Sequence, residues 1–383
     1  MIRCCSLLLL ILPGVWGQTA GDFQGRKAWK IETNKLRVTV LQGGGHLAEL
    51  TLRAAAGERE VNPLWIPPWP SIEPSTYNRD KHGAIYGTDS EAATLAGIMG
   101  HNVCFDYWGA PSGAEFRAGL SYHGEVNTLA WTRLSGGSGE ITYRADLPES
   151  RTSLLRTLRL RPDQNVLYFE ETAENKTAFD RPFGWVQHVT FGPPFVDAAH
   201  CFFDASGTRA EHRSGSAVRE FQWPQAPGKD FRRFSNAAAS SDMAYVLLDP
   251  ARDVEFVSAL NTEHRLLVAY LFHRRDYPWL NVWEQNRDRT EPPWNGRAQT
   301  RGMEFGNTRA AGTARAWLRM PMLWDTPTFG WLDGRGRQTV RYLAVTVRIP
   351  AGFDRVRDIR VQGSDILIEG ATSIRVPFDP SLF

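Results

Sequence analysis

The sequence carries almost no net charge, which limits the partners that it can attract. It has 44 Lys and Arg residues against 42 Asp and Glu residues, a formal net charge of +2. Such a balance creates no single-sign field that would draw nucleic acid or an anionic membrane to the surface. We therefore expect neither of these partners, and we expect the ligand to be a neutral small molecule.

Cysteine is also scarce, with four residues in a chain of 383. Cys4 and Cys5 lie before the end of the N-terminal apolar run, which is not the position of a lipid-modified cysteine. Cys104 and Cys201 form either one disulfide, in an oxidising compartment, or two buried thiols. The sequence leaves both readings open.

Long apolar runs are absent except near the N-terminus. A short positive start and an apolar run over residues 7–12 are followed by Pro13 and by small residues up to Ala20. This pattern predicts a secretory signal peptide at residues 1–20, because the run is too short for a spanning helix of about 20 apolar residues. We expect a secreted or periplasmic protein in which residues 21–383 form a single domain.

Several catalytic signatures are missing. The chain has no His-Glu-x-x-His motif, no Cys/His cluster, no serine-nucleophile elbow, no phosphate-binding loop and no dinucleotide fingerprint. His123 and Glu125 could supply two metal ligands, whereas a metal site usually has three or more. We expect no metal and no cofactor, although the sequence does not decide whether a loop binds an ion such as Ca²⁺.

The chain is rich in short segments of alternating apolar and polar residues. KLRVTVLQ, SLLRTLRL and RYLAVTVRI are examples, separated by Gly, Pro, Asn and Asp, and only residues 92–98 show a helical pattern. Strands without helical crossovers pack as antiparallel sheets, so we expect an all-β fold, a large antiparallel β-sandwich. Two irregular segments, residues 57–95 and 284–301, interrupt the strands, and loops of this length are often functional.

The strand-like segment FGWVQHVTF, residues 183–191, carries a histidine among small side chains. Alternation divides it into a bulky face, with Phe183, Trp185, Gln187, Val189 and Phe191, and a small face, with Gly184, Val186, His188 and Thr190. The bulky face is the natural core, which leaves room for a ligand beside the imidazole of His188. A hydrogen-bonded core histidine is the alternative.

A second segment, RGMEFGNT, places a carboxylate in the middle of a strand. Glu304 lies between Met303 and Phe305 and shares its face with glycine and threonine. Burying an unpaired carboxylate is costly, so Glu304 either takes part in chemistry or forms a salt bridge. The salt-bridge candidates are Arg297, Arg301 and Arg309.

Aromatic residues are abundant, with 14 Trp and 20 Phe. An indole combines an apolar face with an N–H donor, which suits the C–H faces and hydroxyl groups of a sugar. Trp279 and Trp283, in PWLNVW, could line a binding groove or fill the core.

Together, GHNVCFDYWG, YHGEVN, FGWVQHVTFGPPF, PWLNVW and RGMEFGNT resemble the galactose mutarotase-like superfamily, which contains the aldose 1-epimerases. The resemblance covers about residues 30–350 and preserves the order of the motifs. It implies a β-supersandwich that binds a sugar in an open groove and uses no cofactor.

The resemblance also implies roles for individual residues. In the family, a strand histidine acts as general acid on the ring oxygen, and a late glutamate removes the proton of the anomeric hydroxyl. The matching positions are His188 and Glu304. His101 matches a sugar-binding histidine, and His123 lies where a turn approaches the sugar.

Two further matches to sugar-binding residues are looser, namely Arg79 and Asp276. The chain also departs from the family pattern, because Gln187 precedes the histidine where the family commonly has Asn. This departure leaves room for a protein that binds a sugar without acting on it.

The sequence therefore predicts an aldose 1-epimerase-like enzyme that interconverts sugar anomers by acid–base ring opening. The alternatives are a non-catalytic secreted carbohydrate-binding protein and a polysaccharide lyase or hydrolase, which would pair Glu304 with Glu284 or Asp276. If His188 and Glu304 face each other as opposite charges, the pKa of the histidine rises and that of the glutamate falls. We then expect a bell-shaped pH profile with a broad neutral plateau.

Overall fold

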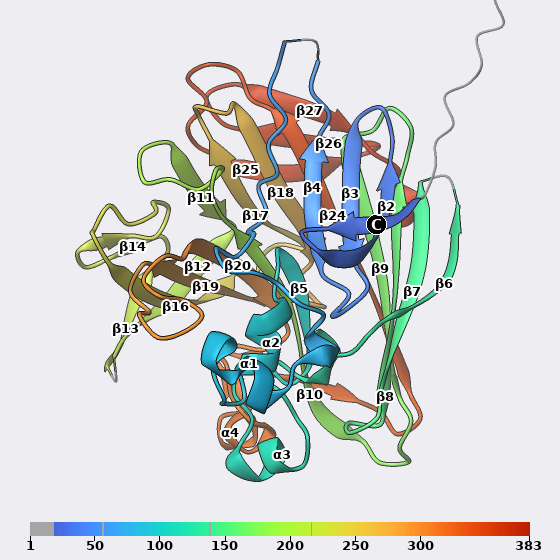
Figure 1. The fold of residues 1–383 in the computed structure, drawn as a ribbon. Helices are drawn as coiled ribbons and strands as arrows, with labels where there is room; N and C mark the ends of the chain where they lie inside the picture. Colours follow the sequence, from blue (N-terminus) through green and yellow to red (C-terminus); the bar gives the residue numbers. More distant parts are fainter. Residues whose placement is uncertain (1–18, 56, 138, 216) are drawn as a thin grey trace, which may run out of the picture.

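Strands are the predominant regular structure of the described chain, as the alternating pattern predicts (Figure 1). Among the described residues, no helix is long and apolar enough to cross a membrane. The predicted signal peptide, residues 1–20, lies outside the described residues apart from Thr19 and Ala20, whose backbone begins the first strand. The computed structural model describes residues 19–383 except residues 56, 138 and 216.

The larger main sheet, called the long sheet below, has 14 antiparallel strands within the described part of the chain. One of them, β23 (Gly330–Leu332), pairs with β10 beside the main path. The others follow the order β1 (Thr19–Phe23), β2 (Arg26–Glu32), β3 (Leu36–Leu41), β4 (Leu47–Leu52), β5 (His101–Asp106), β10 (Arg181–Phe191), β20 (Gln299–Gly306), β19 (Trp279–Asn286), β16 (Ser240–Leu248), β12 (Gly207–Ser214), β13 (Ala217–Gln222), β14 (Gln225–Ala226) and β15 (Lys229–Asp230).

The second main sheet has eight strands within the same residues and is called the eight-stranded sheet. Its order is β11 (Cys201–Ala205), β17 (Val254–Asn261), β18 (Leu266–His273), β24 (Arg337–Arg348), β9 (Val166–Asn175), β8 (Thr152–Leu160), β7 (Glu140–Leu147) and β6 (Thr132–Gly137). Two smaller sheets consist of β25 (Asp358–Gln362), β26 (Asp365–Glu369) and β27 (Ser373–Pro377), and of β21 (Met322–Leu323) and β22 (Thr326–Pro327).

The main core lies between the inner faces of the long sheet and the eight-stranded sheet. Val103 and Phe105 on β5 and Phe305 on β20 contribute from one side. Phe272 on β18 stacks on Phe305 from the other, with ring centroids 4.1 Å apart. Burial of one such side chain contributes about 1.5–3 kcal/mol, so this interface holds the sandwich together.

The three-stranded sheet β25–β27 covers the opposite face of the eight-stranded sheet. Leu343 and Val345 on β24 pack there against Ile366 and Ile368 on β26. Figure 1 shows β25–β27 beside β17, β18 and β24. The eight-stranded sheet is therefore buried on both faces at this point, and the outer face of the long sheet remains for a functional site.

A fully buried ion pair on the eight-stranded sheet projects into the main core. Arg156 Nε on β8 lies 2.7 Å from Glu171 Oε1 on β9. Gln187 Nε2 on β10 donates to Glu171 Oε2 at 2.7 Å, and the Tyr342 hydroxyl on β24 donates to Gln187 Oε1 at 2.9 Å. These bonds join the two sheets and satisfy charges that would be costly to bury alone.

Four short α-helices in the described residues gather at one end of β10 (Figure 1). The predicted helical pattern at residues 92–98 is confirmed as α2 (Ala92–Gly97). The helices α1, α3 and α4 were not predicted, because they bury few apolar residues. Their bounds are α1 (Arg79–Tyr86), α3 (Gly113–Arg117) and α4 (Ala314–Arg319), and the short 3₁₀ turns are η1 (Pro74–Thr76), η2 (Glu125–Asn127) and η3 (Pro380–Leu382).

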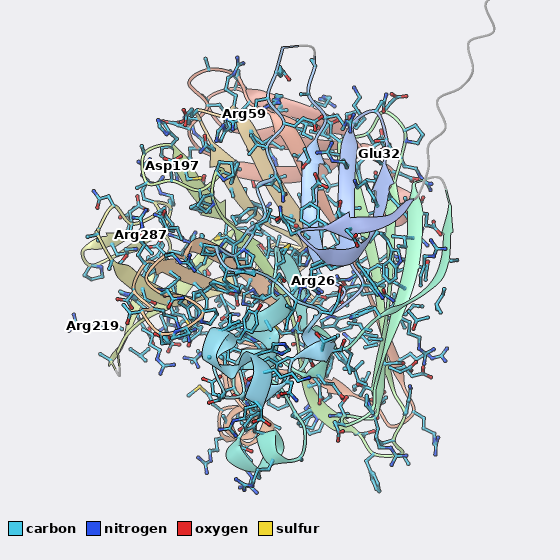
Figure 2. The ribbon with its side chains drawn as sticks, in the orientation of Figure 1. Arg26, Glu32, Arg59, Asp197, Arg219 and Arg287 are labelled. Atoms are coloured by element: carbon cyan, nitrogen blue, oxygen red, sulfur yellow. The ribbon has the colours of Figure 1, made fainter. Side chains whose placement is uncertain are left out.

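Arg26 fixes this helical region to the long sheet. Its buried guanidinium donates from β2 to the carbonyl oxygen of Gly97 at 2.7 Å and to that of Gly43 at 2.9 Å. Figure 2 labels Arg26 near the middle of the view, and Arg59 and Arg219 towards its edges. The end of α2 is therefore held at a defined position over the sheet.

Both described cysteines are free, buried thiols. Of the two readings left open by the sequence, Cys104 and Cys201 follow the one without a disulfide. Cys104 lies on the outer face of β5, in a cluster with Trp108 and Val186, whereas Cys201 lies in the main core.

Candidate functional site

His188 and Glu304 meet on the outer face of the long sheet. They lie on the neighbouring strands β10 and β20, where Val186 pairs with Gly306 and Thr190 pairs with Gly302. The bulky face of β10 points into the main core, as the alternation predicts. His188 and Glu304 therefore both project from the opposite face of the sheet.

The two side chains are in direct contact. His188 Nε2 lies 3.1 Å from Glu304 Oε1, and the side chains are 6% and 1% exposed. His188 Nδ1 lies 2.9 Å from Thr190 Oγ1, which fixes the ring on its other edge. Glu304 Oε2 is buried and has no hydrogen-bond partner among the described residues.

Gly302 makes this position of the glutamate possible. A Cβ atom at residue 302 would overlap Glu304 Oε1, because the carboxyl group lies directly over the glycine. Glycine at this strand position therefore leaves free the space that the Glu304 carboxyl group occupies.

Burial determines the charge state of the pair. It lowers the pKa of His188 to about 4. It also raises the pKa of Glu304 well above its ordinary value, and the indole of Trp108 partly offsets this rise although it falls short of hydrogen-bond geometry. The expected Coulombic shifts in the opposite directions are therefore wrong, because loss of hydration outweighs attraction at such depth. Burial thus favours the uncharged form of both side chains.

His123 is a fixed neutral donor beside this pair. The Gly109 N–H donates to His123 Nδ1 at 3.1 Å, so the neutral ring carries its proton on Nε2. Burial, and next the neighbouring His188, lower the pKa of His123 well below its ordinary value. The ring centroids of His123 and His188 are 5.0 Å apart.

A small cavity, called the His188 cavity below, opens beside these residues. Its volume is about 90 Å³, whereas small-molecule pockets usually measure about 300–1,000 Å³. The expected open groove is therefore not present, because side chains fill it, and a pyranose enters only if the lining moves. The cavity is lined by Glu91, Leu95, Ile98, Trp108, Tyr122, His123, His188, Met243, Trp283, Arg289, Trp294, Glu304 and Ala311.

The two irregular segments of the sequence meet at this cavity. Arg289 donates two hydrogen bonds, at 3.0 and 2.9 Å, to the carboxylate of Glu91. Its guanidinium also lies over Trp294, 4.4 Å from the ring centroid. Residues 57–95 and 284–301 are thus joined by an ion pair and by packing of their tryptophans.

Four of the eight predicted site residues line the cavity, namely His123, His188, Trp283 and Glu304. His101 does not, because it shares the inner face of β5 with Val103 and Phe105. Its Nε2 lies 3.0 Å from Gln187 Oε1 in the core. The structure therefore does not bring His101 to the His188 cavity, and its match to a sugar-binding histidine stays a prediction.

The other three predicted residues also lie elsewhere. Trp279 is fully buried and donates from Nε1 to the carbonyl oxygen of Pro327 at 2.7 Å, so it is not part of the cavity wall. Arg79 is exposed at the start of α1 and lines a different cleft. Asp276 lies in a third cleft, before β19.

The sequence missed several residues of the site. Trp108 and Tyr122 lie in or beside quoted motifs, but nothing local indicates that their side chains reach His188. Glu91, Arg289 and Trp294 come from the irregular segments. The length of those segments was a signal for function, whereas their contacts depend on the fold.

The described residues support neither the predicted salt bridge between Glu304 and an arginine nor the predicted carboxylate pair of a hydrolase. Arg301 forms its ion pair with Glu284, and Arg309 forms one with Glu211, so neither is paired with Glu304. Glu284 also binds Lys229 at 2.8 Å and does not line the cavity. Among the described residues, neither Glu284 nor Asp276 joins Glu304 there as the second carboxylate of a hydrolase.

The His123–Glu125 pair does not form a metal site. The Glu125 carboxylate accepts the backbone N–H groups of Ser150 at 2.8 Å and of Glu149 at 3.2 Å, away from the imidazole. A surface group that could ligate an ion consists of Asp197, His200 and Glu263, with His200 Nδ1 3.1 Å from Asp197 Oδ1. Asp197 Oδ1 already accepts two backbone N–H groups there.

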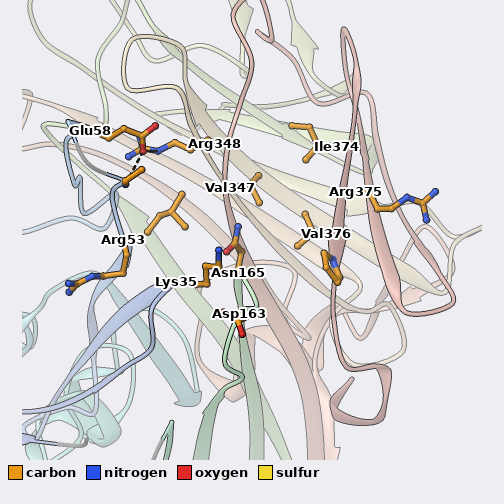
Figure 3. Close-up of a pocket in the computed structure, with 13 residues that line it drawn as sticks. Lys35, Arg53, Glu58, Asp163, Asn165, Val347, Arg348, Ile374, Arg375 and Val376 are labelled. Atoms are coloured by element: carbon orange, nitrogen blue, oxygen red, sulfur yellow. Dashed lines mark hydrogen bonds and ion pairs between the residues drawn. The ribbon is translucent and has the colours of Figure 1, made fainter. Parts of the chain in front are cut away.

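A larger cleft of about 480 Å³ lies away from the catalytic candidates (Figure 3). Glu58 and Arg348 form an ion pair of 3.3 Å at its rim. Figure 3 shows Arg375 pointing away from the other lining residues, and it is paired with Asp365 at 2.6 Å. This cleft is open and its charges are largely paired, so the His188 cavity is the stronger candidate site despite its smaller volume.

Comparison with known proteins identifies the fold. No family model and no curated protein matches the chain. Among solved structures, it is similar to a protein provisionally named an aldose 1-epimerase from Klebsiella pneumoniae, with a TM-score of 0.60, 14% identity, and 85% of this chain and 80% of that chain covered.

Two further solved structures are similar. A galactose mutarotase-like protein from Clostridium acetobutylicum has a TM-score of 0.58 at 11% identity, with 88% of this chain and 100% of that chain covered. A galactose mutarotase related enzyme from Lactobacillus acidophilus has a TM-score of 0.54 at 14% identity, with 84% and 99% covered. The chain has the galactose mutarotase-like fold.

Proposed function

We propose that this protein is a secreted enzyme that interconverts the anomers of a free aldose, with His188 and Glu304 as its acid–base pair. The observation that carries the proposal is the 3.1 Å contact between His188 Nε2 and Glu304 Oε1 beside a cavity. The fold supports it, because structures named as epimerases and mutarotases share this architecture.

The reaction needs one proton donor and one proton acceptor. A proton moves to the ring oxygen, the bond between the anomeric carbon and that oxygen breaks, and the anomeric hydroxyl loses its proton to become a carbonyl. Rotation about one bond and the reverse proton transfers then close the ring on the other face. The pair therefore begins and ends the reaction with one proton.

Burial favours Glu304 as the resting site of that proton. Transfer of this proton from Glu304 to His188 across their hydrogen bond produces an imidazolium acid and a carboxylate base. This is the arrangement that the family resemblance implies. His123 Nε2–H provides a neutral donor near the same reacting atoms, and Trp283 provides an apolar wall.

Polarimetry of freshly dissolved α-D-glucose and α-D-galactose tests the proposal. We expect the protein to speed the decay of optical rotation above the buffer rate. His188→Gln and Glu304→Gln should each reduce the rate by about 10²–10⁴-fold, as expected for loss of a general acid or base.

Glu255→Gln is the matched control, because Glu255 is also a buried strand carboxylate but lies outside the cavity. A wild-type decay rate equal to that of buffer for both sugars would refute catalysis.

The second candidate is a secreted carbohydrate-binding protein without activity. The direct contact between His188 and Glu304 favours this candidate, because it leaves no room between the acid and the base for the reacting atoms of a sugar. Sugar binding by calorimetry together with an unchanged decay of rotation would establish it.

A further inference from the structure

A second cleft, called the Trp331 cleft below, lies outside the His188 cavity and shares no lining residue with it. Its volume is about 400 Å³, within the usual range for ligand sites. It is lined by Arg274, Arg275, Asp276, Pro278, Asn307, Asp325, Thr326, Pro327, Phe329, Gly330, Trp331 and Gln338.

An exposed tryptophan on a rigid strand forms one wall. Trp331 is 55% exposed, although indole rings are usually largely buried. It lies on β23, which is hydrogen-bonded to β10 with Trp331 opposite Pro182. Its ring centroid is 5.7 Å from that of Phe329, which in turn stacks on Trp317. The indole therefore presents a fixed apolar face to the cleft.

Asn307 presents an oriented hydrogen-bond donor. Its Oδ1 accepts the backbone N–H of Trp185 at 2.7 Å and the hydroxyl of Thr308 at 2.8 Å. Both acceptor positions of the oxygen are thus used, which fixes the direction of Nδ2. A Cβ atom at Gly330 would come within 2.6 Å of this Nδ2, so the glycine keeps the space around the amide open.

Asp276 presents an unsatisfied acceptor. Its side chain is only 14% exposed, yet its carboxylate accepts no hydrogen bond from the described residues. The nearest cation is Arg275, 3.9 Å away and itself 74% exposed. Burial raises the pKa of Asp276 to about 6, so it is ionised at neutral pH. Hydroxyl groups of a ligand could donate hydrogen bonds to this carboxylate in place of those that it has lost from water.

We propose that the Trp331 cleft is a second saccharide-binding site, which holds a neutral pyranose unit of an oligosaccharide. The indole face packs on the C–H face of the sugar, while the Asp276 carboxylate and the Asn307 amide bind its hydroxyl groups. Asp276 and Asp325 balance Arg274 and Arg275, so the cleft does not select an anionic sugar. This site does not depend on catalysis at His188.

Calorimetric titration with maltotriose, cellotriose and galactotriose tests the site, because a trisaccharide does not fit the His188 cavity. We expect at least one of them to bind at millimolar concentration. Trp331→Ala and Asp276→Asn should each weaken that binding by about tenfold or more, which is about 1.4 kcal/mol.

Phe179→Ala is the control for removal of an exposed aromatic ring, because Phe179 is 79% exposed and does not line the cleft. Glu304→Gln should leave trisaccharide binding unchanged, which separates this site from the proposed active site. Absence of binding by all three trisaccharides, or binding that survives Trp331→Ala in a folded protein, would overturn the proposal.

Discussion

At the residue scale, the activity that we propose depends on the single proton shared by His188 and Glu304. Burial lowers the pKa of His188 and raises that of Glu304, which widens the pH range in which the pair holds one proton. The two titrations belong to the pair rather than to either residue alone. The broad neutral plateau therefore has a different cause from the one expected from the sequence.

The pH profile of anomer interconversion should fall at both ends for defined reasons. Below pH about 4 the pair gains a second proton, mainly on His188, and loses its base. Above the raised pKa of Glu304, the pair loses its only proton and therefore its acid. Rates measured by polarimetry across the pH range should show this plateau.

Infrared difference spectroscopy tests the assignment independently of activity. At pH 7, wild type minus Glu304→Gln should show the C=O band of a protonated carboxylic acid. A carboxylate band in its place would show that Glu304 is ionised at rest, so that burial does not control its charge.

Gly302→Ala should reduce activity with little change in stability. The new methyl group displaces the Glu304 carboxyl, which can rotate away, so the strand itself is not strained. A displacement of about 1 Å at a catalytic group costs about 10²-fold in rate. Gly137→Ala is the control, because a Cβ there meets no atom within 4 Å. If Gly302→Ala were as active as the wild type, Gly302 would not be needed to position the Glu304 carboxyl group.

At the scale of elements, the ion pair between Glu91 and Arg289 joins the segments on either side of the cavity. Since the cavity is too small for a pyranose, these segments must separate before a sugar can enter. This ion pair is partly buried, with Glu91 17% and Arg289 30% exposed. It therefore stabilises the contact between the two segments by about 1 kcal/mol.

Glu91→Gln should loosen both segments. Hydrogen exchange followed by mass spectrometry should show amide exchange about fivefold faster at residues 92–97 and 284–301, with the strands of the core unchanged. Glu291→Gln removes the other, 54% exposed partner of Arg289 and should have a smaller effect. Equal exchange in the two variants would exclude Glu91 as the closing contact.

The faces of the strands could be predicted from the sequence, because alternation is a local property. The inward face of β10 follows from this rule. The meeting of His188 with Glu304 was instead implied by the family resemblance, because alternation does not tell which strands pair. The same rule could have corrected His101, since HNVCFD places it on one face with Val103 and Phe105.

The contacts of the loops could not be predicted in this way. The pairing of Glu91 with Arg289 joins residues that are 198 positions apart, and no local pattern encodes it. The pKa shifts were missed for a related reason. They depend on how deeply the groups are buried, and the depth is set by segments whose positions the sequence does not reveal.

At the scale of the whole molecule, the buried pair of Arg156 and Glu171 should contribute strongly to the integrity of the sandwich. Glu171→Gln leaves a fully buried guanidinium without its counter-charge and should lower the free energy of unfolding by about 3–5 kcal/mol. Chemical denaturation measures this change.

Glu170→Gln provides a neighbouring comparison on the same strand. Glu170 pairs with Arg341 at 2.8 Å, but the two side chains are 30% and 48% exposed. Its loss should cost less than about 1 kcal/mol. If the two variants were equally stable, the buried pair would not be a major support of the fold.

The small sheet β25–β27 has a consequence for how the protein can be handled. The small sheet covers one side of the sandwich, and neither proposed sugar site lies on that side. Both sites are formed on the long sheet or at the ends of its strands. A probe anchored through the exposed residues of β27 should therefore leave both sites accessible to dissolved glycans, with the protein displayed in a single orientation.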